Sequence, residues 1–224
     1  MGDAIGQMLP LAIGVAISPM PIVAMILMLM SSSGRSTGLA FAIGWLGGIG
    51  VAGAVLLVLA GPADTGTSSA SPTWVSVLQL VLGLALLVLA VKQWRGRPRG
   101  DTEPPVPKWM DSIATFTPPK AAGLAVLLGV VNPKNLVFLI GGATAVAQSG
   151  ADPGGQAVAW IIFTIIAGIG VVAPLVTYLA MGDRAQGVLE EVRSWMVHNN
   201  TAIMAVLCLV IGAKLIGQAI SGLA

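Results

Sequence analysis

The sequence predicts an all-α integral membrane protein with six transmembrane helices, arranged as two inverted three-helix repeats whose first and fourth helices are interrupted. Three observations lead to this class. Of the 224 residues, 56% are hydrophobic and only 9% are charged, whereas soluble domains have about a quarter of their residues charged. The mean hydropathy is +0.91, and the apolar residues gather in six long stretches. Apart from Lys134 and Lys214, the Lys and Arg residues fall on alternate connections between these stretches or at the ends beside them.

Each apolar stretch is long enough to cross the hydrocarbon core, which takes about 20 helical residues. The predicted spans are residues 5–30, 38–61, 73–94, 121–148, 156–181 and 199–221. A polar linker rich in Pro and Gly separates the third span from the fourth, and we expect a short interfacial helix in it around residues 109–116. The predicted segments are a first repeat, a basic cytoplasmic linker and a second repeat, over residues 1–94, 95–120 and 121–224.

The stretch 183–200 has the helical spacing of an amphipathic segment, with apolar side chains at Val188, Leu189, Val192 and Trp195. Two interpretations fit this spacing. The segment is either a separate helix that lies in the membrane interface, or a helical extension of the fifth or sixth span.

The charges predict the orientation of the spans. The side that carries the N-terminus holds Asp3, Asp64 and Asp152 in its connections, and it holds no Lys or Arg. The opposite side holds nine cations: Arg35, Lys92, Arg95, Arg97, Arg99, Lys108, Lys120, Arg184 and Arg193. By the positive-inside rule the second side is cytoplasmic. We therefore expect both termini outside a plasma membrane and the basic linker inside.

Two stretches of the chain have a similar pattern. In "GVAISPMPIVAM" (14–25) and "LGVVNPKNLVFL" (128–139), Ser18-Pro19 aligns with Asn132-Pro133. Each half of the chain contains three spans, and because three is odd the halves must insert with opposite topology. Inverted repeats with interrupted helices are typical of transporters that bind their substrate near the middle of the membrane.

Both dipeptides predict a helix break in the middle of a span. Proline removes a backbone donor and clashes with the preceding turn, and it disfavours helical geometry at the residue before it. Ser and Asn are favoured N-caps, and Pro is favoured at the first helical position. We therefore expect a new helix to start at Pro19, followed by Pro21, and another to start at Pro133.

A helix start within the membrane presents unpaired N–H groups and the positive end of the helix dipole. Lys134 adds a full charge beside the second start, and Asn135 follows it. Together these groups predict a site for a phosphate, sulfate or carboxylate. The alternative is a plain proline kink in which neighbouring helices satisfy the freed backbone groups. Lys214, in the sixth span, either reaches the interface, contacts the same anionic group or pairs inside the bundle.

The remaining composition argues against several function classes. With one Cys, Cys208, and one His in the chain, we expect no metal site. No Asp or Glu lies within a predicted span, so a carboxylate proton relay is not predicted. The sequence shows no nucleophile–base pair, phosphate-binding loop or nucleic-acid-binding pattern, and we expect neither an enzyme, nor a cofactor, nor a nucleic-acid partner.

Taken together, "SPMPIVAMILMLMSSSGRSTGLAFAIGW", "VNPKN" and "HNNTAIMAVLCLVIGAKLIGQ" resemble the GAP or sulfolipid-1-addressing protein family, the actinobacterial branch of the LysE exporter superfamily. The resemblance covers almost the whole chain. It implies six membrane helices in a three-plus-three repeat, a plasma-membrane location and a role in moving envelope glycolipids or their precursors outward. It also implies a functional centre at Ser18, Pro19, Pro21, Asn132, Pro133, Lys134 and Asn135.

The leading functional hypothesis is a transporter of an anionic lipid or glycolipid. An exporter of a small molecule such as an amino acid, and a non-transporting scaffold of a lipid-export machine, are the alternatives. Few polar groups lie in the spans, which favours an amphiphile with one charged head and apolar tails. The expected partners are the lipid, a second copy of the chain in a homodimer, and envelope-lipid export machinery.

Overall fold

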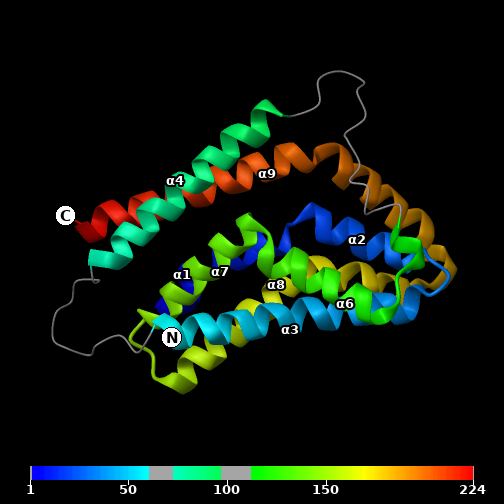
Figure 1. The fold of residues 1–224 in the computed structure, drawn as a ribbon, viewed down its shortest axis with the longest axis horizontal. Helices are drawn as coiled ribbons and strands as arrows, with labels where there is room; N and C mark the ends of the chain where they lie inside the picture. Colours follow the sequence, from blue (N-terminus) through cyan, green and yellow to red (C-terminus); the bar gives the residue numbers. More distant parts are fainter. Residues whose placement is uncertain (1, 61–72, 97–111, 224) are drawn as a thin grey trace.

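The computed structural model describes residues 2–60, 73–96 and 112–223, and every regular element among them is helical (Figure 1). The first half contains α1 (Gly2–Ala16), α2 (Pro19–Leu29), α3 (Gly34–Ala60) and α4 (Thr73–Arg95). The second half contains α6 (Pro118–Val126), the π-helical turn η2 (Leu127–Val131), α7 (Pro133–Ala147), α8 (Pro153–Met181) and α9 (Ala185–Leu223). The predicted all-α class is confirmed.

The helices long and apolar enough to cross a membrane agree closely with the predicted spans. Four single helices pass this test: α3, α4, α8 and α9. Two bent pairs, α1 with α2 and α6–η2 with α7, pass it together, so the structure has up to six spans if each pair counts as one. Both bends occur where Ser18-Pro19 and Asn132-Pro133 predict helix breaks. The inverted relation between the two halves stays a prediction.

The structure describes residues 183–200 in full, whereas part of the segment 109–116 lies outside the described residues. Of the two interpretations of residues 183–200, the extension of the sixth span is correct, because α9 runs unbroken for 39 residues. At 1.5 Å per residue it is roughly twice as long as the hydrocarbon core is thick. Of the helix expected around residues 109–116, only a 3₁₀ turn, η1 (Ile113–Thr115), lies within the described residues.

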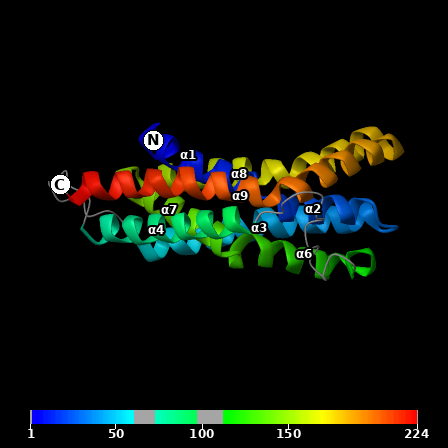
Figure 2. The same ribbon diagram turned by 90° about the horizontal axis from the view of Figure 1, so that it is seen from above.

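Contacts between helices run mainly from one half of the chain to the other. Helix α4 lies beside the C-terminal part of α9, while α3 packs on α6 and α8, and α1 packs on α7 and α8 (Figures 1 and 2). The start of α1 and the end of α9 lie at the same end of the bundle. This placement brings the two broken spans into direct contact at the centre of the molecule.

Candidate functional site at the two helix breaks

The first break lies between α1 and α2, whose axes differ by 48°. Ser18 has an extended backbone, with φ −96° and ψ 106°, and Pro19 follows at the first position of α2. In a continuous helix the carbonyl of Val15 would accept from the N–H of residue 19, which proline lacks. The Ser18 hydroxyl donates to that carbonyl instead, at 2.7 Å.

The expectation that Ser18 caps α2 through its side chain is wrong, because Ser18 makes no capping hydrogen bond to that helix. A capping oxygen accepts from the second or third residue of the helix. The third residue here is Pro21, which has no N–H, and only the N–H of Met20 remains for a cap. The hydroxyl bonds instead to Val15, at the end of α1. Pro19 and Pro21 together leave α2 with few free donors at its start.

The second break lies between η2 and α7, and the chain turns by 65° there. Asn132 caps α7 as predicted, since its side-chain oxygen accepts from the N–H of Lys134 at 3.1 Å. In the π-turn the carbonyl of Leu128 would accept from residue 133, five positions on, and Pro133 has no N–H. The fully buried side chain of Asn135 supplies the missing donor, with its Nδ2 3.0 Å from that carbonyl.

Lys134 joins the two breaks. Its side chain is 4% exposed, and its Nζ donates to the Gly14 carbonyl at 2.8 Å and to the Ser18 hydroxyl at 2.7 Å. The ammonium also lies 5.1 Å from the centre of the Phe138 ring. The Ser18 hydroxyl is 3.2 Å from Oδ1 of Asn135, so Ser18, Lys134 and Asn135 form one buried network.

The electrostatics of this network are unusual for the interior of a membrane protein. Both hydrogen-bond acceptors of Lys134 are neutral, and neither is a carboxylate. The ammonium lies at the C-terminal end of α1, where the helix dipole favours a positive charge. Even so, a cation in the middle of a span costs about 2.5–3.5 kcal/mol. An anionic guest would compensate this charge fully.

Three residues of the site were missed by the sequence reasoning. Gly14 supplies the carbonyl that Lys134 binds, Phe138 supplies the ring one helical turn beyond it, and Gly170 of α8 packs on the carbonyl of Ala16 so closely that a Cβ would overlap it. Phe138 could have been found from its spacing of four residues after Lys134. No local signal marks Gly14 or Gly170, because their roles depend on contacts between distant helices.

Lys214 lies apart from this network. Its Nζ donates to the Gln7 carbonyl on α1 at 2.7 Å. Gln7 precedes Gly14 by seven residues, which is roughly 10 Å along a helix. This bond is exposed and its acceptor is a neutral carbonyl near the start of α1, so it does not decide among the interpretations considered for Lys214, and the role of Lys214 stays a prediction.

The helix starts present fewer free N–H groups than the sequence reasoning expected. Prolines occupy three of the relevant positions, and Asn132 already accepts from the N–H of Lys134. The group in this site that could bind an anion is the Lys134 ammonium, which donates here to Gly14 and Ser18. Binding of a substrate by these residues stays a prediction.

A family model described as "Sap, sulfolipid-1-addressing protein" matches residues 8–221, nearly the full chain. No curated protein and no solved structure matches the chain.

Proposed function

The chain belongs to the Sap, sulfolipid-1-addressing protein family, and on that premise we propose that it moves an anionic lipid or glycolipid, or a precursor of one, across the plasma membrane toward the cell envelope. The predicted orientation, with both termini outside, is part of the proposal. We also propose that the lipid crosses the membrane without any covalent change. A homodimer and an association with envelope-lipid export machinery are further parts that family membership motivates.

The observation that carries this proposal is the burial of Lys134 between two broken spans, with no carboxylate of the described residues bonded to it. If this side chain only filled space, Met or Leu would cost less free energy to bury, because an uncharged side chain needs no hydrogen-bond or ion-pair partner. A cation kept at such a place is typical of substrate pathways in membrane proteins.

In the proposed mechanism the Lys134 ammonium exchanges its acceptors. When a head group arrives, the N–H groups that now bond Gly14 and Ser18 turn to its anionic oxygens, and charge-assisted bonds of this kind are stronger than those to neutral acceptors. The freed carbonyl at the end of α1 then needs a new donor, so α1 and α7 shift relative to each other. The two breaks are the natural hinges, since the chain there already lacks regular helical hydrogen bonds.

A second candidate function is supported by the completeness of the same network. Because Lys134 has protein acceptors, it also suits a scaffold in which the lysine holds the two breaks together permanently. The two functions differ in one testable respect. The transporter requires the ammonium to leave Gly14 and Ser18 during each cycle, whereas the scaffold requires it to stay.

The test is lipid movement in vesicles of phosphatidylcholine that contain the purified protein and a trace of fluorescent phosphatidylglycerol. Dithionite destroys the fluorophore in the outer leaflet only, so loss beyond half of the signal measures movement. We expect Lys134→Met to lower the rate about tenfold, because a bonded anion loses a charge-assisted hydrogen bond. Lys214→Met serves as the matched control, and we expect it to retain most of the activity.

Movement by the wild type that Lys134→Met leaves unchanged would refute the role of the ammonium. No movement of phosphatidylglycerol or of a fluorescent glucosyl diacylglycerol by the wild type would favour the scaffold. Equal movement of fluorescent phosphatidylcholine would show that the site does not select an anionic head.

A further inference from the structure

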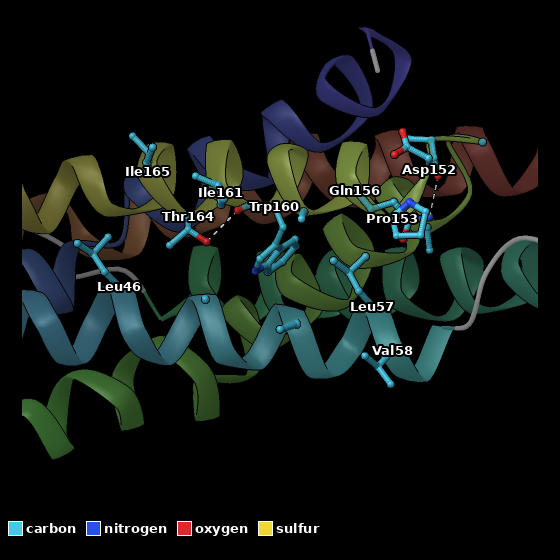
Figure 3. A pocket seen from close by; sticks show the side chains of 16 residues that line it. Leu46, Leu57, Val58, Asp152, Pro153, Gln156, Trp160, Ile161, Thr164 and Ile165 are labelled. Atoms are coloured by element: carbon cyan, nitrogen blue, oxygen red, sulfur yellow. Dashed lines mark hydrogen bonds between the residues drawn. The ribbon is translucent and has the colours of Figure 1, made fainter.

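A cleft of about 1070 Å³ lies between α3 and α8, at the end of the bundle where α7 connects to α8 (Figure 3). It is separate from the lysine network, since neither Ser18 nor Lys134 lines it. Because both of its helices are candidate membrane spans, the cleft opens where the surrounding molecules are lipids.

The walls of the cleft are apolar and its hollow comes from small residues. Leu46 and Leu57 of α3 point toward α8, with the indole of Trp160 between the two helices, and Ile161 and Ile165 of α8 also line the cleft (Figure 3). Gly50 and Ala54 lie on the α3 side of the cleft, and a Cβ added at Gly50 would meet nothing within 4 Å. The cleft is therefore open beside Gly50, which has no side chain, and Ala54, which has only a methyl group.

The Trp160 ring is fixed in place at the floor of the cleft. It stacks on Phe163 with ring centres 4.4 Å apart, and it packs so closely on Gly53 that a Cβ there would overlap the ring. The buried Trp160 Nε1 has no hydrogen-bond partner among the described residues. An unpaired buried donor is unfavourable, and the close packing on Gly53 holds the ring in place despite it.

The mouth of the cleft is polar and contains no cation. Asp152 and Gln156 line it, and Asp152 is its one ionisable residue among those described. The Asp152 carboxylate accepts from the N–H of Gly154, and the Gln156 amide donates to the Ala151 carbonyl. A carboxylate repels phosphate and sulfate, whereas carboxylate and amide groups both bond hydroxyls. The mouth therefore suits a hydroxyl-bearing head.

The length of the cleft suits an extended hydrocarbon chain. From Gln156 to Ile165 the helix rises roughly 14 Å, which is about half of the hydrocarbon thickness of a bilayer. An acyl chain that enters beside the polar mouth would run along this wall from the interface to the middle of the membrane.

We propose that the α3–α8 cleft binds one acyl chain of a glycolipid, with sugar hydroxyls at Asp152 and Gln156. The inference rests on the proposed lipid transport and narrows the substrate to a glycolipid, whose hydroxyls bind at the mouth of the cleft and whose anionic group binds Lys134. It also gives the substrate a sideways path between the bundle and one leaflet. The lysine network and the cleft would then bind different parts of one molecule.

The experiment uses the full chain in phosphatidylcholine vesicles that contain a glucosyl diacylglycerol with a diazirine in one acyl chain. After irradiation, mass spectrometry locates the adducts. We expect labelling of α3 and α8 residues that line the cleft. Gly50→Phe should lower this labelling about tenfold, because its ring displaces at least ~2 buried methylenes of the chain. Gly47→Phe is the matched control, since Gly47 also has open space but does not line the cleft.

A second pair keeps the test informative if Gly50→Phe does not fold: Ala54 lines the cleft and its exposed neighbour Val55 does not. Equal labelling of Ala54→Phe and Val55→Phe would overturn the inference, because it would show ordinary contact with bulk lipid. Equal labelling by diazirine phosphatidic acid would overturn the preference for a hydroxylated head.

A third outcome is that a second copy of the chain covers the cleft. Absence of labelling together with covalent dimers of Val58→Cys, formed by a bifunctional maleimide, would demonstrate this and overturn the inference. Failure here is distinguishable from failure of the proposed function, because labelling needs no transport and the dithionite assay needs no diazirine.

Discussion

Replacing Asn135 by leucine tests whether side chains substitute for the hydrogen bonds that the prolines remove. Asn135 is fully buried, and its Nδ2 donates to the Leu128 carbonyl at 3.0 Å. Leucine has a similar volume, so the change leaves little cavity and mainly removes the donor. The Leu128 carbonyl cannot recover a backbone donor, because residue 133 is proline.

The expected loss follows from the burial of that carbonyl. Leaving a buried acceptor without a partner costs about 1–3 kcal/mol. The contact of Asn135 with Ser18 adds little, since the Ser18 hydroxyl keeps its shorter bond to Val15. A loss of about 2 kcal/mol corresponds to a fall in the unfolding midpoint of roughly 4–8 °C for a chain of this size.

The single cysteine makes the measurement direct. Cys208 is 2% exposed, so a thiol-reactive dye becomes fluorescent only as the detergent-solubilised protein unfolds. Asn199→Leu is the matched control. The Asn199 amide also donates to a carbonyl, that of Trp195 at 2.9 Å, but this bond is exposed. Water can replace it, and we expect a change within about 0.5 kcal/mol. A midpoint for Asn135→Leu equal to that of the wild type would refute the reasoning.

Two further comparisons in the same assay test the packing of α3 on α6 and on α8. Gly44→Ala should lower the free energy of unfolding by about 1–3 kcal/mol, since its Cβ would lie 2.5 Å from the Ala122 carbonyl oxygen. Gly47→Ala is the control: its Cβ would lie in open space, and the change should be neutral or stabilising. An equal loss of stability in the two variants would contradict this explanation. Trp45→Phe should lower the free energy of unfolding by about 1–2 kcal/mol more than Trp160→Phe. The Trp45 indole donates to the Ala167 carbonyl at 3.1 Å, whereas the Trp160 indole has no partner among the described residues. A larger loss for Trp160→Phe would contradict the role given to the Trp45 hydrogen bond.

The sequence was sufficient for those features that depend on local composition. The spans follow from runs of apolar residues, and both breaks follow from prolines that cannot donate a backbone hydrogen bond. The cap at Asn132 was also predictable, because its acceptor and the N–H of Lys134 are two residues apart. The chain's membership of the Sap family confirms the resemblance carried by the motifs around both breaks.

The contacts between the breaks could not be predicted in the same way. The carbonyl of Gly14 and the ammonium of Lys134 are 120 residues apart, and only the packing of α1 on α7 brings them together. The direction of the Ser18 hydroxyl was also not predictable, because it donates to Val15 and accepts from the distant Lys134 instead of capping α2. The α3–α8 cleft is invisible in the sequence, because glycines that pack closely and glycines that border open space look alike there.

The bond between Lys134 and the first span has a consequence for biogenesis. During synthesis residues 14 and 18 emerge long before residue 134, so the acceptors of the lysine are already in the bilayer when the fourth span arrives. Without them, that span would enter as a bent, proline-containing segment with an uncompensated cation, at a cost of about 2.5–3.5 kcal/mol. The N-terminal half therefore acts as an insertion partner for the C-terminal half. The order in which the two halves are translated becomes part of how the protein reaches its topology.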